Sequence, residues 1–163
     1  AFGNRHVNIS DFKQNYERLQ QRTIPSNFIL MAFAPQLDVL EKSDLFITHA
    51  GQNSLNEAMN LAVPMIALPR GVDQPLNACF IEMAGIGRKL DEGFDSNDLR
   101  ESVIDVLSNR TRYKEKCVEA MMLLKSSPGA EGAANEIINV ANGEPTGGYG
   151  WMVKSRLGRT LLP

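Results

Sequence analysis

The residues best suited to chemistry follow a short apolar run near the middle of the chain. Residues 45–47 are typical of a buried strand, and the polar residues after them open a helical pattern. A helix start offers unpaired backbone N–H groups and the positive end of the helix dipole, which together attract anions. Gly51 lets a bulky anion approach the backbone, and His49 adds a side-chain donor. Asn53 and Ser54 can cap the helix or face the anion, so this stretch predicts a diphosphate site.

A longer stretch around this site resembles the signature of the UDP-glycosyltransferase family, which includes UDP-glucuronosyl- and UDP-glucosyltransferases. The matching positions are chemically diverse and stay in register without a break, so they are far more specific than a lone glycine motif. They are Phe33, Ala34, Pro35, Gln36, His49, Gly51, Asn53, Ser54, Glu57, Pro64, Pro69, Asp73 and Gln74. The resemblance implies the C-terminal, donor-binding domain of a two-domain glycosyltransferase of the GT-B type, with a Rossmann-like parallel sheet flanked by helices.

The resemblance also implies a role for each matching side chain. In the family an aromatic residue at the Phe33 position stacks on uracil, and the Gln36 and Glu57 positions bind the ribose hydroxyls. A carboxylate suits a vicinal diol because it can accept hydrogen bonds from both hydroxyls. The expected UDP-binding residues are Phe33, Ala34, Gln36, His49, Gly51, Asn53, Ser54 and Glu57, and the expected donor-sugar-binding residues are Asp73 and Gln74.

Each of these roles has a plainer alternative. By itself His49 is more often a structural histidine, although its place at a strand end before a glycine favours the phosphate role. Glu57 can be a solvated acid on a helix face, and Phe33, where many relatives have Trp, can be a core aromatic residue. Asp73 can cap a helix that starts at Pro75, and it can do so while also binding a sugar.

The chain contains no Asp-x-Asp motif of the kind that usually holds Mg²⁺ or Mn²⁺ in metal-dependent sugar transferases. We therefore expect no metal and no other cofactor, with UDP-sugar as the co-substrate. A helix dipole, backbone N–H groups and His49 would stabilise the charge that grows on the leaving diphosphate. The family resemblance implies inverting transfer of a hexosyl group to a hydroxyl of a lipophilic small molecule. It places the general base in an N-terminal acceptor domain.

The alternation of strands and helices predicts one α/β domain over residues 1–141, followed by a loose tail over residues 142–163. Right-handed crossovers between the buried runs would make the strands parallel. The expected strands cover residues 28–33, 45–47, 65–68 and about 88–90. The expected helices cover about residues 10–21, 53–62, 74–84, 99–107, 113–124 and 134–141.

One stretch departs from the family pattern. Relatives place a further strand between the first helix and the strand ending at Phe33, but residues 20–27 are too polar to form one. We therefore expect a sheet that is reduced or has lost a segment. Ala1, Phe2 and Gly3 read as the end of a strand whose beginning is missing, so we also expect the chain to be a fragment.

Composition excludes several classes of partner. The net charge of −2 comes from intermingled acids and bases, with no basic block for nucleic acid. No apolar run reaches the ~20 residues needed to span a bilayer.

Cys79 and Cys117 lack metal-ligand spacing and are expected to be free thiols. The expected partners are UDP-sugar and, through a missing domain, a lipophilic acceptor. The sequence does not assign a cellular location.

Two functional hypotheses remain at this stage. The first is a UDP-glycosyltransferase donor domain that binds UDP-sugar but transfers slowly or not at all without the acceptor half. The alternative is a non-catalytic nucleotide-sugar-binding subunit that needs a partner carrying that half. An epimerase ranks lower, because only Glu57 and Asp73 offer acid or base groups near the sugar.

Overall fold

The structure is a computed structural model, and it describes residues 8–143. The chain divides into two compact units, residues 1–122 and residues 123–163. Most of the predicted tail, residues 144–163, lies outside the described residues, as does the strand end predicted at residues 1–3.

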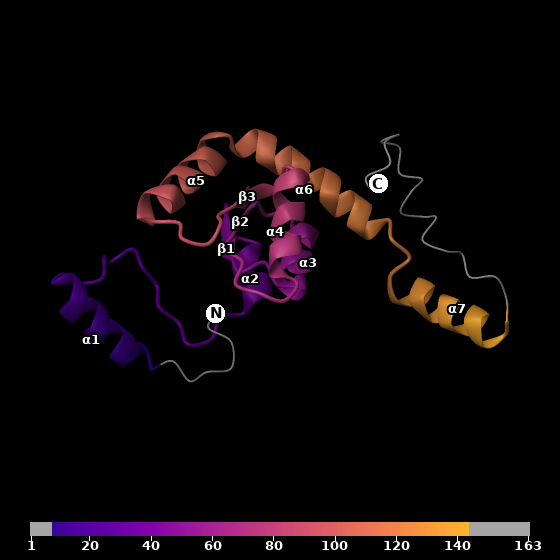
Figure 1. Cartoon of the computed structure of the whole chain (residues 1–163), viewed down its shortest axis with the longest axis horizontal. Helices are drawn as coiled ribbons and strands as arrows, with labels where there is room; N and C mark the ends of the chain where they lie inside the picture. The colour runs from indigo at the N-terminus through magenta and orange to yellow at the C-terminus, as the bar shows by residue number, and fades with distance from the viewer. Residues whose placement is uncertain (1–7, 144–163) are drawn as a thin grey trace. The chain divides into compact units, whose positions relative to one another are not determined.

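The first unit is built on a parallel sheet of three short strands in the order β1-β2-β3 (Figure 1). Helices precede and separate these strands, so the predicted α/β class and parallel strand direction are confirmed. The strands are β1 (Phe46–Thr48), β2 (Met65–Ala67) and β3 (Gly87–Lys89). Among residues 8–143 the helices are α1 (Ile9–Gln20), α2 (Gln36–Leu40), α3 (Gln52–Asn60), α4 (Gln74–Met83), α5 (Ser96–Ser108), α6 (Arg110–Lys125) and α7 (Gly129–Ala141). Only α2 was not anticipated.

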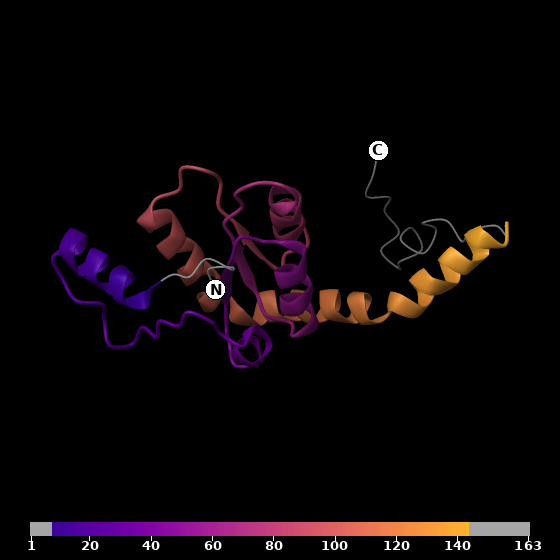
Figure 2. The same ribbon diagram turned by 90° about the horizontal axis from the view of Figure 1, so that it is seen from below.

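Strand β2 forms the centre of the core because it pairs on both edges and is covered on both faces. Met65, Ile66 and Ala67 are all fully buried, as a central parallel strand requires. Ile66 packs with Val106 of α5 and Tyr113 of α6. Because side chains alternate along a strand, Met65 and Ala67 point to the opposite face, the face on which α4 lies (Figure 2).

Strand β3 approaches its neighbours closely because it begins with a glycine. Gly87 pairs with Met65, and a Cβ at this position would lie 2.0 Å from the Met65 carbonyl oxygen and 2.8 Å from Ile81 Cγ2 of α4. Any other residue would therefore force β3 and α4 away from β2. A glycine here permits the tight helix-to-sheet packing that buries Ile81.

Polar contacts hold α6 against the loops that lead into the strands. The Arg110 guanidinium forms an ion pair with Asp44 before β1, and Lys114 Nζ donates to the Ala62 carbonyl oxygen at 2.8 Å before β2. Ala62 is buried with a φ of 52°, a left-handed conformation that this contact helps to fix. The cysteines are free, as predicted, and burial raises the pKa of the Cys117 thiol to about 12.

The strand predicted over residues 28–33 is absent, and this prediction was wrong. The segment is irregular, and its side chains are largely exposed, with Ile29 at 86% and Phe33 at 79%. Among residues 8–143 no strand pairs with it, because the polar residues 20–27 supply no neighbour. An extended apolar segment becomes a strand only where a neighbour accepts its backbone hydrogen bonds. The prediction was based on the apolar side chains alone, and these do not supply a pairing partner.

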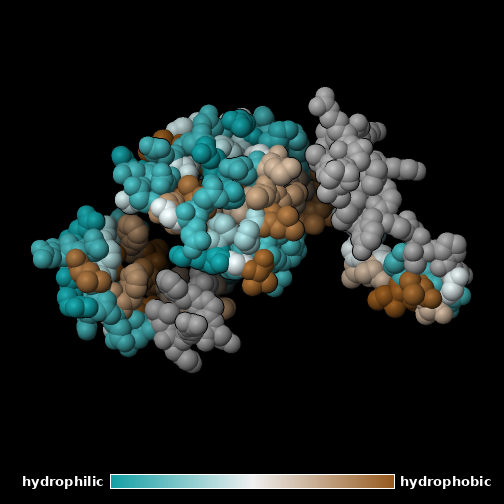
Figure 3. Space-filling model, in the orientation of Figure 1, coloured by the Kyte–Doolittle hydropathy of each residue, from teal (hydrophilic) through white to brown (hydrophobic). Residues whose placement is uncertain are grey.

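The second unit contains α7, whose residues are all at least partly exposed. Ile137, Ile138 and Val140 present large apolar surfaces, and Figure 3 shows a hydrophobic patch on this helix. Within the part of the chain that the structure describes, no helix is both long and apolar enough to cross a membrane.

Candidate functional site

The candidate site is centred on the N-terminus of α3, just after β1 ends. Gly51 precedes the helix in an extended conformation and provides no side-chain cap. Ala50, fully buried, has a φ of 63°, a left-handed conformation that costs a residue other than glycine about 1–2 kcal/mol. The Thr48 hydroxyl accepts a hydrogen bond from the Ala50 N–H at 3.2 Å and helps to hold this turn. The turn leads directly into the first N–H groups of α3, which are groups of the kind that bind anions.

His49 lies directly over Gly51. A Cβ at position 51 would come within 2.8 Å of His49 Nε2, so the imidazole occupies the space that a side chain would otherwise fill. The His49 side chain is exposed at the surface beside the helix start. The structure therefore brings the predicted phosphate donor and the predicted glycine together at the α3 N-terminus.

Three of the predicted UDP-binding residues form a hydrogen-bonded cluster. Gln36, the first residue of α2, donates from Nε2 to Glu57 Oε2 at 2.6 Å and to Ser54 Oγ at 3.2 Å. Ser54 and Glu57 are three residues apart and share one face of α3. All three residues are partly buried. Gln36 thus orients the Glu57 carboxylate, which keeps its second oxygen, Oε1, for another donor.

The two predicted sugar-binding residues lie where the loop after β2 leads into α4, and the first of them contacts the α3 start. Asp73 Oδ2 accepts from the Gln52 backbone N–H of α3 at 3.2 Å and from Asn77 Nδ2 at 2.9 Å. Although Asp73 occupies the N-cap position of α4, its side chain makes no capping hydrogen bond there. Gln74 Oε1 accepts from the backbone N–H groups of Arg70 and Gly71 at 2.8 and 3.3 Å, which closes the loop on itself.

Asn77 is a site residue that the sequence analysis missed. Its side chain is buried on α4 and donates from Nδ2 both to Asp73 and to the Ala50 carbonyl oxygen, each at 2.9 Å. Ala78 and Ile81 flank it on the buried face of this helix. A polar amide among these apolar positions was the available signal, because buried amides need hydrogen-bond partners.

Three predicted residues are not joined to these clusters. Phe33 is exposed and Ala34 is half-buried in the irregular segment before α2. Asn53 is exposed on the first turn of α3 and makes no side-chain hydrogen bond with another described residue. The described residues contain no group of three or more His, Cys, Asp or Glu that could hold a metal ion.

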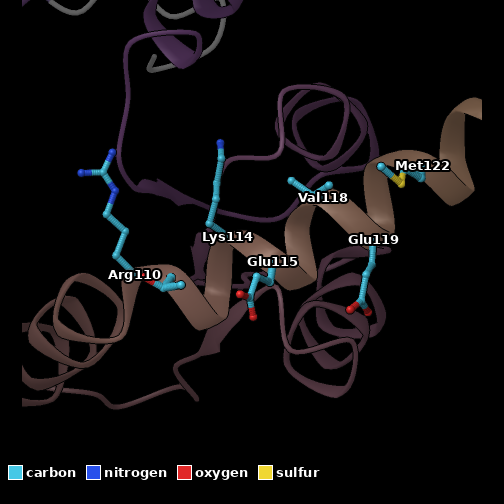
Figure 4. A pocket seen from close by; sticks show the side chains of 7 residues that line it. Arg110, Lys114, Glu115, Val118, Glu119 and Met122 are labelled. Carbon is cyan, nitrogen blue, oxygen red and sulfur yellow. The ribbon is translucent and has the colours of Figure 1, made fainter.

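A cavity of about 590 Å³ lies elsewhere, along α6 (Figure 4). Its described lining comes from α6, and two of the lining residues, Arg110 and Lys114, already contact the strand-leading loops. None of the predicted site residues lines it. The lining residues are Arg110, Thr111, Lys114, Glu115, Val118, Glu119 and Met122.

A further polar cluster supports β3. Its residues lie outside the set predicted for the site. Asp105 Oδ2 accepts from the Tyr113 hydroxyl at 2.7 Å and from Arg88 Nη1 at 3.0 Å. These hydrogen bonds, first that of Tyr113 and then that of Arg88, hold the pKa of Asp105 below its ordinary value against the effect of burial. Burial and the Asp105 carboxylate together raise the pKa of Tyr113. This cluster ties β3 to α5 and α6.

Comparison with known proteins places this geometry in context. Residues 11–129 match the family model described as "UDP-glucoronosyl and UDP-glucosyl transferase". An uncharacterized UDP-glucosyltransferase of Bacillus subtilis, YojK, is 36% identical over 116 residues, which is 71% of this chain and 28% of that protein.

Solved structures give a similar result. The glycotransferase of kitacinnamycin superposes with a TM-score of 0.65 at 32% identity, over 71% of this chain and 30% of that one. Os79 from O. sativa, solved in complex with U2F and trichothecene, superposes with a TM-score of 0.60 at 26% identity, over 79% of this chain and 31% of that one. The chain spans about three tenths of the length of these relatives.

Proposed function

Because the chain belongs to the family of UDP-glucuronosyl and UDP-glucosyl transferases, we propose that it is a donor-binding domain whose α3 N-terminus binds the diphosphate of a UDP-sugar. The observation that carries the proposal is the convergence of two clusters on α3. The Gln36–Glu57 pair lies along one face of the helix, and Asp73 lies at its N-terminus. Helix α3 thus offers a group for the ribose and N–H groups for the diphosphate, and Asp73 at the start of α4 adds a carboxylate for the sugar.

The ribose is the part of the ligand with the best-defined receptor. Glu57 Oε1 can accept a hydrogen bond from a ribose hydroxyl while Gln36 holds Oε2 in place. Phe33, exposed on the segment that leads into α2, would cover the uracil ring and lose its exposure on binding. Titration of uridine, UMP and UDP would separate these contributions.

We further propose that transfer needs no metal. His49 and the α3 N–H groups would carry the charge that develops on the departing diphosphate. The proposed reaction is inverting transfer of a hexosyl group to a hydroxyl of a lipophilic small molecule. A general base and an acceptor site from an N-terminal domain would complete it, so this chain alone would transfer little or no sugar. Os79, which has been solved in complex with UDP, supports the choice of ligand.

A second candidate is a non-catalytic nucleotide-sugar-binding subunit that docks a partner carrying the acceptor half. The exposed apolar segment at residues 28–33 favours it, because such surfaces often mark interfaces. Addition of an acceptor-domain protein to the purified chain, with sedimentation to show that the chain is monodisperse, separates the candidates. A monodisperse chain that gains transferase activity on addition of an acceptor-domain protein supports the subunit, whereas a monodisperse chain with no such gain supports the donor domain alone.

Calorimetric titration with UDP tests the proposed site. We expect saturable binding that EDTA does not change and that Glu57→Ala weakens by at least about tenfold, because a charge-assisted hydrogen bond is lost. Glu101→Ala on α5 is the matched control, since Glu101 is an exposed glutamate with no contact to the site. Failure of a folded wild-type chain to bind UDP, or equal loss in both variants, would refute the proposed site.

A further inference from the structure

We propose that Asn77 is a positioning residue that fixes the Asp73 carboxylate at the entrance of the candidate site. This inference rests on the proposed function, because Asp73 is taken to meet the donor sugar. The Asn77 side chain is only 8% exposed, and both hydrogens of its amide are in use. One contact reaches the turn after β1 and the other reaches the loop after β2.

The contact with Ala50 fixes the turn that precedes α3. Ala50 is buried in a left-handed conformation, so its carbonyl oxygen cannot turn to solvent for a partner. Asn77 supplies that partner at 2.9 Å, and the Thr48 hydroxyl holds the N–H of the same residue. A buried carbonyl without a partner would oppose this conformation. Asn77 therefore helps to maintain the direction of the α3 N-terminus.

The contact with Asp73 fixes the carboxylate relative to that N-terminus. Asp73 Oδ2 receives hydrogen bonds from both Asn77 and the Gln52 N–H, so it lies where the turn and the α4 start meet. The Asp73 side chain is otherwise exposed and free of capping contacts. Without Asn77 the carboxylate would keep one weak contact of 3.2 Å and would sample several rotamers. Recognition of the donor sugar depends on the orientation of this carboxylate, so it would be affected first.

The first test needs no ligand. In ¹⁵N NMR spectra of the free chain, the Gln52 backbone amide reports on the carboxylate that it contacts. We expect Asn77→Ala and Asp73→Asn to move this resonance, and the double variant to move it no further than Asp73→Asn alone. Asn60→Ala, at the exposed end of α3, is the control. An unchanged Gln52 resonance in Asn77→Ala would overturn the proposal.

The second test compares affinities for UDP and UDP-glucose. We expect Asn77→Ala to weaken UDP-glucose binding about tenfold and UDP binding by less than twofold. In an Asp73→Asn background, Asn77→Ala should affect the affinities for the two ligands equally. A merely structural role would weaken both ligands equally in either background, and that result would overturn the proposal. If the wild-type chain binds neither ligand, the proposed function fails, while the Gln52 resonance still decides whether Asn77 holds Asp73.

A third variant guards against misfolding. Should Asn77→Ala fail to fold, the same substitution in an Ala50→Gly background should fold, because glycine adopts positive φ without strain. The Ala50→Gly chain is then the reference for both tests. An Asn77→Ala, Ala50→Gly chain that keeps the Gln52 resonance of this reference would overturn the proposal.

Discussion

Two apolar runs of this chain look alike in sequence and differ completely in structure. Residues 65–67 form β2 and are fully buried, whereas residues 28–33 are irregular, with Ile29 86% exposed. Both runs are short and apolar and both precede a loop with site residues. The difference lies in their neighbours, because β2 has β1 and β3 on its edges and the other run has no paired strand among the described residues.

The comparison shows that burial of a strand depends on its partners. Burial of apolar side chains is favourable, but the backbone N–H and C=O groups that are buried with them still need hydrogen bonds. For β2, these bonds come from two strands and the side chains are covered by α4 and by α5 with α6. The two regions should therefore respond very differently to equivalent substitutions.

The largest contrast is expected between two isoleucines. Ile66→Asp places a charge in a fully buried position and should cost at least about 5 kcal/mol, enough to unfold a typical domain. Ile29→Asp should change the free energy of unfolding by less than about 0.5 kcal/mol, because the side chain is already in water. Urea unfolding followed by circular dichroism measures both. A large loss for Ile29→Asp would mean that residues 28–33 are buried in solution and would break the comparison.

A pair of glycines tests the tight pairing of β2 and β3. Gly87→Ala puts a Cβ 2.0 Å from the Met65 carbonyl oxygen, and the forced shift of backbone should cost about 3 kcal/mol. Gly71→Ala is the control, since no atom lies within 4 Å of the added carbon. Thermal unfolding should show a clear loss for the first variant only. Equal melting temperatures would argue against this register.

The Asp105 cluster predicts a pH-dependent contribution to the anchoring of β3. The pKa of the Asp105 carboxyl group lies below its ordinary value of 3.8 in the folded chain. The stabilisation is therefore present above about pH 4 and is lost as the pH falls through this lower folded-state pKa. Asp105→Asn should therefore cost about 1 kcal/mol at pH 7. The difference in the free energy of unfolding between wild type and variant should disappear below pH 4. A gap that stays constant from pH 7 to pH 3 would exclude a role for the ionised carboxylate.

The smallest effect concerns ligand binding by the exposed run itself. Phe33→Ala should weaken UDP binding several-fold, because stacking on a base contributes about 0.5–1.5 kcal/mol beyond area burial. Phe28→Ala, another exposed aromatic of the same run, should leave the affinity unchanged. Phe33→Trp should tighten binding slightly through its larger ring. Equal behaviour of the two alanine variants would remove Phe33 from the proposed UDP site.

Much of the candidate site could be predicted from sequence because its signals are local. The strand before His49, the glycine at position 51 and the helix after it are neighbours in the chain, and the structure places all three as expected. The apolar positions of α3 follow a local period as well, and Leu55, Ala58 and Met59 are buried on one face. Local periodicity fixes which face of a helix is buried, wherever a core exists to receive it.

Tertiary structure decided what depends on distant neighbours. No pattern within residues 28–33 showed that they would stay unpaired, since pairing requires a strand from elsewhere in the chain. Nor did any pattern foretell that Gln36 would hold Glu57, or that Asn77 would join Ala50 to Asp73, because Gln36 and Glu57, like Ala50 and Asn77, lie in different parts of the chain. Sequence determined the chemical groups and the local elements that carry them. Only packing of the sheet and helices determined which groups meet, because hydrogen bonds between elements form only after those elements have docked.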